Sequence, residues 1–219
     1  MNITDYQLFL ASRSPRRFEL LRQLGLAPQV RPTGVVETSR DGEAPTALVA
    51  RLAREKALAA CEQIGRPDPP GIVLAADTSV VLDDNCLGKP VDADDAERML
   101  RALRGRTHHV MTGVWLIATD DGRSSGGVQS TKVIFNEFDD TLLRSYAAST
   151  EPLDKAGAYA IQERGALLCE RIEGSWSNVV GLPLESLPAW LAKIVVSICW
   201  RDPAQNLACL VGESDSASG

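Results

Sequence analysis

The chain has 219 residues, 44% of them hydrophobic and 24% charged, which is ordinary for a globular protein with a sizeable core. Its formal net charge of -6 and isoelectric point near 5.0 argue against a broad nucleic-acid-binding or membrane-binding surface, because such surfaces need clustered Lys and Arg. Any binding of phosphate must therefore be local.

The cysteines and histidines form no pattern typical of a metal site or a disulfide framework. The two histidines are adjacent, and the five cysteines are widely spaced without a CxxC pair: Cys61, Cys86, Cys169, Cys199 and Cys209. The N-terminal residues lack the pattern of a signal peptide, and the apolar stretches are too short to span a bilayer. We therefore expect a reduced, cytoplasmic protein that binds neither nucleic acid nor a membrane.

The first predicted elements are a short buried strand, Tyr6–Ala11, and a helix that ends at Gly25. Ser14 suits the N-cap of this helix, and Pro15 suits its first position. The strand and the helix meet within a few residues, so the backbone N–H groups at the start of the helix are available to an anion.

This junction gathers Ser12, Ser14, Arg16 and Arg17. Hydroxyl groups, free backbone N–H groups and forked guanidinium groups can together hold a chain of phosphates. A capped helix with solvated surface arginines explains the same residues. Both interpretations stay open from this stretch alone.

A second strand is predicted around Gln29–Gly34, then a polar loop over Thr38–Ala44 and a helix from Pro45 to about Ile64. Lys56 interrupts the apolar stripe of this helix, which otherwise consists of Val49, Leu52, Ala53, Ala57 and Ala60. The lysine either reaches from the edge of the core to solvent or points into a cleft. Glu37 lies in a loop, where a solvated carboxylate is the ordinary interpretation.

Residues 71–83, GIVLAADTSVVLD, predict either a buried pair of strands or one long bent strand. Asp77 interrupts this apolar run, and a carboxylate there is costly unless it is paired, metal-bound or open to a cleft. Strand ends in α/β sheets are also where ligand sites form. We therefore favour a functional role for Asp77 over a structural one.

Lys89 lies in the following turn, DNCLGKP, between a glycine and a proline that restrict the backbone. Such a turn can hold a cation in place, although Gly–Lys–Pro turns also occur on ordinary surfaces. A helix is predicted over Asp92–Leu103. The segments HVMTGVWLIAT and VQSTKVIFNEF flank DDGRSSGG and predict an antiparallel hairpin.

The predicted core is completed by a helix over about Asp140–Ala148, a glycine-punctuated β region over Asp154–Ile172 and an amphipathic stretch from Leu184 to about Val196. In the β region, Asp154, Lys155 and Gln162 could reach a ligand, but a turn followed by a strand explains the segment nearly as well. We expect the final residues, GESDSASG, to be disordered.

Strands that alternate with helices, followed by a hairpin, predict an α/β domain with a mixed sheet. The chain offers scattered cations and one or two carboxylates, with neither a Ser–His–Asp set nor a Cys–His set. These groups suit metal-assisted phosphoryl chemistry, in which positioning and charge stabilisation provide most of the catalysis. The residues alone therefore predict an enzyme that acts on a phosphate ester or anhydride with Mg²⁺.

Six segments between about Leu8 and Leu191 occur in a characteristic order: LASRSPRRFELLRQLG, RLAREKA, AADTSVVLDDNCLGKP, AERMLRALRGRTHHVMTGV, STKVIFNEF and EPLDKAGAYAIQERGALLCERIEGSWSNVVGLPL. In order and approximate spacing they resemble the motifs of the Maf family of nucleoside triphosphate pyrophosphatases. The resemblance implies an α/β fold with a mixed, mostly elongated β-sheet flanked by helices, and two lobes around a central cleft, as in Maf and inosine triphosphatase-like proteins. We expect this domain over residues 4–198 and a partly disordered C-terminal tail over residues 199–219, and a homodimer stays open.

The resemblance also implies hydrolysis of a nucleoside triphosphate to the monophosphate and pyrophosphate, with a divalent metal cation such as Mg²⁺, Mn²⁺ or Co²⁺. Asp77 matches the acid that the family is taken to use to activate water, and Lys56 and Lys89 match its essential lysines. Glu37 matches an acidic residue of the same cleft. Asp77 and Glu37 are therefore the expected metal-binding residues.

For substrate binding, Ser12, Arg16 and Arg17 match the phosphate-binding loop of the family. Arg16, Thr78 and Gln162 resemble the branch that acts on dTTP and UTP, with modified pyrimidine nucleotides as further candidates. The branch acting on 7-methyl-GTP has DQ in place of DT and lacks the YxIQ segment. That activity and a regulatory role in septum formation, which would not require Asp77 or Lys89, are the alternatives.

Overall fold

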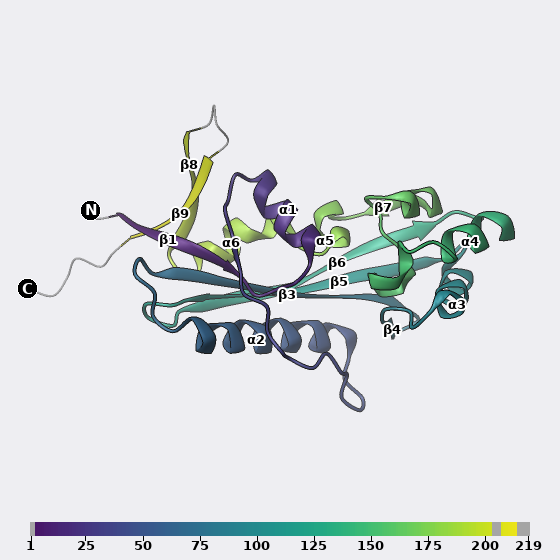
Figure 1. Cartoon of the computed structure of the whole chain (residues 1–219), viewed down its shortest axis with the longest axis horizontal. Helices are drawn as coiled ribbons and strands as arrows, with labels where there is room; N and C mark the ends of the chain where they lie inside the picture. Colours follow the sequence, from purple (N-terminus) through teal and green to yellow (C-terminus); the bar gives the residue numbers. More distant parts are fainter. Residues whose placement is uncertain (1–2, 203–206, 214–219) are drawn as a thin grey trace, which may run out of the picture.

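The computed structural model describes residues 3–202 and 207–213, in which a long mixed sheet runs through the whole molecule (Figure 1). Its strands are β1 (Ile3–Leu10), β2 (Gln29–Val30), β3 (Gly71–Leu82), β4 (Asn85–Leu87), β5 (Thr107–Ala118), β6 (Ser124–Phe135), β7 (Cys169–Glu173), β8 (Val196–Asp202) and β9 (Leu207–Glu213). The α-helices are α1 (Pro15–Gln23), α2 (Pro45–Ile64), α3 (Ala93–Leu103), α4 (Asp140–Ala147), α5 (Trp176–Val180) and α6 (Leu187–Ala192). Four 3₁₀ turns complete the fold: η1 (Pro152–Asp154), η2 (Ala156–Ala158), η3 (Arg164–Leu168) and η4 (Leu184–Ser186).

The strands are ordered β7-β6-β5-β3-β1-β9-β8, with β2 beside β1 and β4 beside β3. β1 is parallel to β2 and β3, whereas the other pairs are antiparallel. Residues 71–82 form one continuous strand, and β5 and β6 form the predicted hairpin. The predicted mixed, elongated sheet flanked by helices is confirmed.

Helix α2 covers one face of the long strands (Figure 1). Its apolar side packs on odd-numbered residues of β3 such as Val73 and Ala75, because successive side chains of a strand point to opposite faces. The close approach depends on Gly113 of β5, since a Cβ added there would lie 2.3 Å from the Val49 carbonyl oxygen. The position of α2 on the sheet is therefore fixed by contact between its backbone and that of β5.

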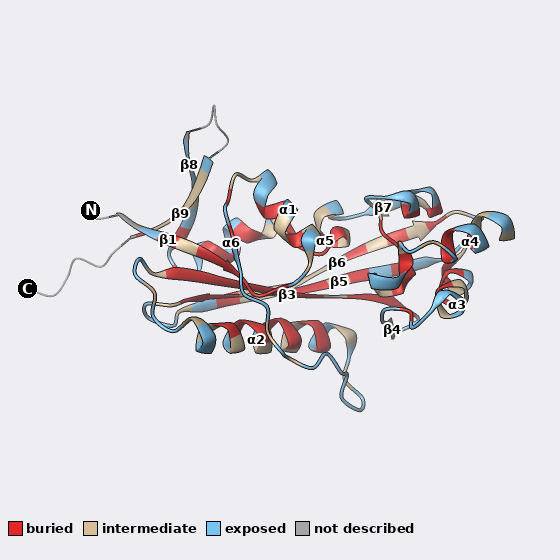
Figure 2. Cartoon of the chain, in the orientation of Figure 1, coloured by how far each residue is buried: buried red, intermediate tan, exposed pale blue. Residues whose placement is uncertain are grey.

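The opposite face of the sheet carries two separate apolar clusters. One contains Ile72 and Leu74 of β3 and packs under α1 and α6, and the other contains Val80 and Leu82 and packs under α3 and α4. Figure 2 shows the buried residues following the strands from one end of the molecule to the other. Thr78 lies between the two clusters on β3, so a polar position separates the two lobes.

The structure differs from the prediction in the segment 154–172. The sequence predicts a β region there, but 3₁₀ turns occupy about half of the segment, and its one strand is Cys169–Glu173. Gly157 has φ +67° and Ala158 has φ +61°, and this left-handed conformation is incompatible with an extended strand.

Strands β8 and β9 form a hairpin at one end of the sheet, and β9 pairs with β1. The expected domain boundary at residue 198 falls inside β8. Residues 212–213 of the GESDSASG segment, expected to be disordered, instead belong to β9, because they pair with β1. Residues 214–219 of this segment lie outside the described residues, as do 203–206 of the expected tail. Within the described ranges, every helix is too short or too polar to cross a membrane.

Candidate active site

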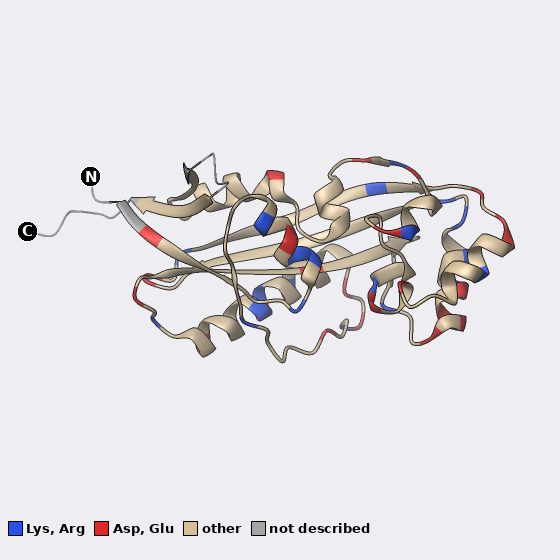
Figure 3. Ribbon diagram, turned by 45° about the horizontal axis from the view of Figure 1, so that its top comes forward, with Lys and Arg blue, Asp and Glu red and all other residues tan. Residues whose placement is uncertain are grey.

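A cavity of about 500 Å³ opens where Thr78 separates the two apolar clusters. Figure 3 shows acidic and basic segments beside the middle of the long strands as well as at the end that carries α3 and α4, while the strands themselves are largely uncharged. The nine residues to which the sequence assigns catalysis, substrate binding or metal binding all line this cavity: Ser12, Arg16, Arg17, Glu37, Lys56, Asp77, Thr78, Lys89 and Gln162. Residues far apart in the sequence therefore lie around one cavity.

Arg17 lines the cavity and is buried. Its guanidinium donates hydrogen bonds to Gly181 O at 2.8 Å, Ser12 Oγ at 3.0 Å and Thr78 Oγ1 at 3.0 Å. Burial lowers the pKa of Arg17, and the charges of Asp77 and Glu37 act in the opposite direction. Because its three acceptors are uncharged, the cation retains its attraction for an anion that enters the cavity.

Arg16 also lines the cavity, and its side chain is one quarter exposed. Its Nη1 lies 3.3 Å from Asp154 Oδ2, so the start of α1 is tied to η1 across the cavity. Ser14 stands at the N-cap of α1 as predicted, but its side chain makes no capping hydrogen bond. A merely capped helix with solvated arginines does not describe this junction.

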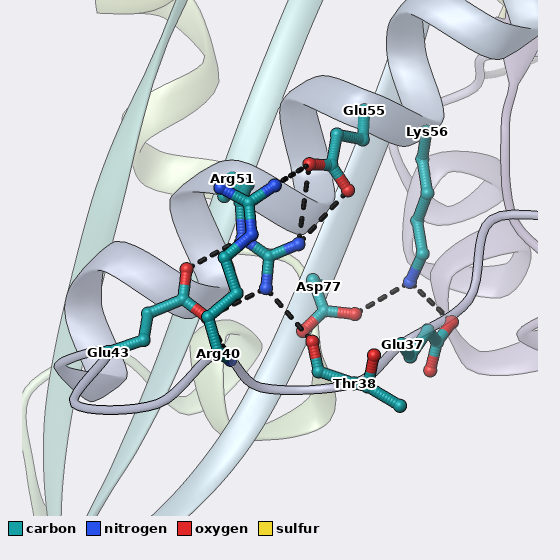
Figure 4. Close-up of polar contacts among 8 residues, drawn as sticks. All are labelled: Glu37, Thr38, Arg40, Glu43, Arg51, Glu55, Lys56 and Asp77. Atoms are coloured by element: carbon teal, nitrogen blue, oxygen red, sulfur yellow. Dashed lines mark hydrogen bonds and ion pairs between the residues drawn. The ribbon is translucent and has the colours of Figure 1, made fainter.

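Another part of the cavity wall carries a chain of three charged groups from three segments (Figure 4). Lys56 Nζ of α2 lies 2.6 Å from Asp77 Oδ1 of β3 and 2.5 Å from Glu37 Oε1 of the loop before α2. Lys56 and Asp77 are buried, whereas the Glu37 side chain is about half exposed. The lysine therefore bridges two carboxylates and does not extend from the core edge into solvent.

The bridge determines the ionisation of Glu37. Partial burial acts to raise the pKa of Glu37, but the hydrogen bond and charge of Lys56 outweigh it, and Lys89 and Arg17 add to the effect. The pKa of Glu37 is lowered as a result, so this carboxylate is held in its ionised form.

Two consecutive residues of β3 line the cavity from opposite faces of the sheet. Asp77 points toward α2, and Thr78 points to the other face, where it meets Arg17. Thr78 Oγ1 and Thr112 Oγ1 are 2.9 Å apart, and Thr112 donates to Asn178 O at 3.1 Å. The hydroxyl of Thr78 is thus oriented by a buried network that joins β3, β5 and α5.

Lys89 and Gln162 face the cavity from turns and are exposed. Neither side chain has a hydrogen-bonding or ion-pairing partner among the residues that the structure describes, so both are available to a ligand. The turn before Lys89 is fixed by a hydrogen bond from Gly157 N to Gly88 O at 2.9 Å.

The carboxylates of the cavity fit a metal only in part. Within residues 3–202 and 207–213, no group of three or more His, Cys, Asp or Glu side chains is arranged to hold a metal ion. Asp77 and Glu37 supply two carboxylates near Lys56. Mg²⁺ commonly uses one or two protein carboxylates together with substrate phosphates. The donor set therefore fits a cation that arrives with a phosphorylated substrate.

Lys155, which the sequence suggests only as a residue that could reach a ligand, also lines the cavity. It is buried, donates to Glu151 O at 3.2 Å and pairs with Asp154. The DKAGAYAIQ segment contains it, but a lysine beside an aspartate in an apparent turn gives no sign of burial.

The sequence matches a known protein family along most of its length. A family model described as Maf-like protein matches residues 7–194. A dTTP/UTP pyrophosphatase of Anaeromyxobacter dehalogenans is 48% identical over 90% of this chain and 98% of its own length. Proteins of the same name from Myxococcus xanthus and Acetivibrio thermocellus are 47% and 45% identical, over 92% and 88% of this chain and 99% and 97% of their own lengths.

Proposed function

The chain belongs to the Maf family, and on this premise we propose that it hydrolyses dTTP and UTP to the nucleoside monophosphate and pyrophosphate. The observation that carries the proposal is the bridge of Asp77, Lys56 and Glu37 opposite the buried guanidinium of Arg17 in one cavity. This arrangement presents cations to a triphosphate and carboxylates to water and a metal ion. The names of the relatives supply the substrate class.

Phosphate binding is assigned to Ser12, Arg16 and Arg17 with the start of α1. Arg17 is fixed by three neutral acceptors, which support a role as a preformed anion site. Lys89, in its fixed turn, is positioned to neutralise the charge that develops on the departing pyrophosphate. A preformed set of donors avoids reorganisation during the reaction.

For the chemical step, Asp77 accepts a proton from the attacking water as the water oxygen bonds to the α-phosphorus and the bond from that phosphorus to the α,β-bridging oxygen breaks. The pyrophosphate leaves with the electron pair of that bond. Lys56 holds the Asp77 carboxylate at 2.6 Å and fixes its orientation toward the cavity. When bound by Asp77 and Glu37, a divalent cation such as Mg²⁺, Mn²⁺ or Co²⁺ would neutralise phosphate charge.

The proposal is tested by measuring pyrophosphate release from UTP, dTTP, CTP, ATP, GTP and 7-methyl-GTP by the purified protein with a divalent cation. UTP and dTTP should be the good substrates. Asp77→Asn should lower kcat by about 10²–10⁴-fold, the usual contribution of a general base. Asp94→Asn, an equivalent change at an exposed position of α3, should leave kcat unchanged.

Preference for 7-methyl-GTP would assign the chain to the alternative branch of the family. Near-full activity of Asp77→Asn would remove Asp77 from the chemical step. Absence of pyrophosphate release from every nucleotide would contradict the enzymatic function altogether.

A further inference from the structure

We propose that Arg51 is a positioning residue of the cleft, which clamps the segment carrying Glu37 to α2 and so keeps Glu37 on Lys56. The effect on turnover rests on the function proposed above, whereas the clamp itself does not. Arg51 lies on α2 and is absent from the residues that line the cavity.

The segment before α2 needs an external support. Residues 31–44 contain neither helix nor strand, and most of them are exposed. Among the described residues, no backbone–backbone hydrogen bond holds residues 32–39. Glu37 nevertheless lies 2.5 Å from Lys56, so side chains must fix this stretch.

Arg51 supplies that support with all three guanidinium nitrogens (Figure 4). Nε and Nη2 donate to the two carboxylate oxygens of Glu43 at 2.6 and 2.7 Å, which is a bidentate pair. Nη1 donates to Glu55 at 3.1 Å, and Nη2 also donates to Thr38 O at 3.0 Å. Thr38 directly follows Glu37, so the clamp grips the backbone beside the site residue.

The clamp is partly shielded from water and extends beyond Arg51. The side chains of Arg51 and Glu43 are only 16% and 9% exposed. An ordinary, fully exposed ion pair contributes little to stability. The Arg40 backbone N–H donates to Glu43 at 3.0 Å, and the Arg40 guanidinium donates to Glu55 at 3.1 Å. The charged groups therefore form a closed network between the loop and α2.

One rigid element determines the position of Glu37 from two sides. Lys56 and Arg51 both belong to α2, which spans Pro45–Ile64 without interruption. Lys56 binds the Glu37 carboxylate, while Arg51 binds the carbonyl of the next residue. The planar fork of arginine can bind Glu43, Glu55 and the carbonyl together, which a lysine ammonium on a flexible stem cannot reproduce.

The test is a double-mutant cycle with UTP as substrate. Arg51→Gln should lower kcat/KM on the order of tenfold in the wild-type background and less than about twofold in the Glu37→Gln background, as expected for coupled residues. Arg51→Lys should retain part of the activity. Arg98→Gln breaks an ion pair of 2.6 Å on α3 and serves as the control, with no expected loss in either background.

Hydrogen exchange of the intact chain gives a second readout that does not depend on activity. In Arg51→Gln, and to a smaller extent in Arg51→Lys, the amides of Arg40 and Glu43, which donate to Glu43 Oε2 and Arg40 O, should exchange faster, while those of β3 and β5 keep their protection. The exchange pattern of Arg98→Gln should match that of the wild type.

Equal losses in both backgrounds, full activity of Glu37→Gln, or unchanged exchange of the Arg40 and Glu43 amides would each overturn the proposal. An active wild type with a fully active Arg51→Gln would overturn it while leaving the proposed function intact. A wild type without activity would contradict the proposed function, and hydrogen exchange would then still decide whether Arg51 holds the segment.

Discussion

At the scale of single residues, Gln162 is the group that we expect to select the base. It faces the cavity without a side-chain partner among the described residues and offers both an amide donor and a carbonyl acceptor. Uracil and thymine share an acceptor at position 4 and a donor at N3, whereas cytosine reverses this pattern. Thr78 and Arg16 are expected to fix the pose that prevents a flipped amide from accepting cytosine.

Gln162→Ala should therefore lower kcat/KM for UTP and dTTP more than for CTP. The ratio of UTP to CTP turnover should fall on the order of tenfold, because a site built to hydrogen-bond its substrate discriminates strongly. Gln63→Ala, an exposed change at the end of α2, is the matched control. An unchanged ratio in steady-state assays would exclude Gln162 from base selection.

His108 gives a prediction about stability. It is buried, its Nε2 lies 2.8 Å from the Tyr159 hydroxyl, and burial lowers its pKa to about 3. An unfolded histidine takes up a proton below pH about 6.5, while the folded one stays neutral. Its stabilising effect is thus fully present above pH 6.5 and is lost as the pH falls from there toward 3.

At pH 5 this loss amounts to about 2 kcal/mol. Urea denaturation at pH 7 and pH 5 gives the loss of unfolding free energy between the two pH values. This loss should be smaller in His108→Gln than in the wild type by roughly that amount. His109→Gln, at the exposed neighbouring position, should behave as the wild type. An identical pH dependence in His108→Gln would contradict the assignment.

At the scale of elements, the contact of α2 with β5 positions half of the site. A Cβ at residue 113 would lie 2.3 Å from Val49 O and 2.8 Å from Ala50 N, and backbone atoms cannot move aside as a side chain can. Gly113→Ala should displace α2 and lower the free energy of unfolding by about 1–3 kcal/mol, as overpacking does. Thermal denaturation provides the measurement.

Gly34→Ala is the stability control, because nothing lies within 4 Å of the added Cβ. Gly113→Ala should also lower UTP turnover, since Lys56 and Arg51 both move with α2. A variant of unchanged stability would show that the helix and sheet can adjust at no cost.

Local sequence patterns predicted the elements that depend on local causes. The predicted Pro45–Ile64 helix is confirmed. It could be predicted because a proline marks its start and Gly65, whose φ is +69°, marks its end. The segment 154–172 was predicted wrongly, since its 3₁₀ turns have no periodic pattern. The pairing of β9 with β1 joins residues about two hundred positions apart, and no local pattern encodes such a contact.

In the candidate site too, local sequence patterns indicated some residues and gave no sign of others. Asp77 and Lys56 stood out because each placed a charge in an apolar pattern, and the structure brings them within 2.6 Å. Arg51 gave no such signal, since its i, i+4 pairing with Glu55 is typical of a solvated helix face. Its contacts with Glu43 and Thr38 depend on the path of the loop, which only the tertiary structure reveals.

At the scale of the whole molecule, the two lobes share their strands. β3 contributes Ile72 and Leu74 to one apolar cluster and Val80 and Leu82 to the other, without a linker between them. Differential scanning calorimetry should therefore record one transition, with equal calorimetric and van't Hoff enthalpies. Gly113→Ala should lower the temperature of this transition without splitting it, and two resolved transitions would show that the lobes unfold separately.

The position of β1 has a consequence for the order in which the protein is made. Among the described residues, residues 3–6 have their strand partners in residues 210–213 of β9, while residues 7–10 pair with β3. During translation, residues 3–6 leave the ribosome long before residues 210–213 have been synthesised. Any nascent or interrupted chain that lacks residues 210–213 leaves those backbone groups unpaired, an open edge of the kind on which chaperones, proteases and aggregation act. The sheet can therefore form these pairs only after β9 has been synthesised, and until then the backbone groups of residues 3–6 lack their partners.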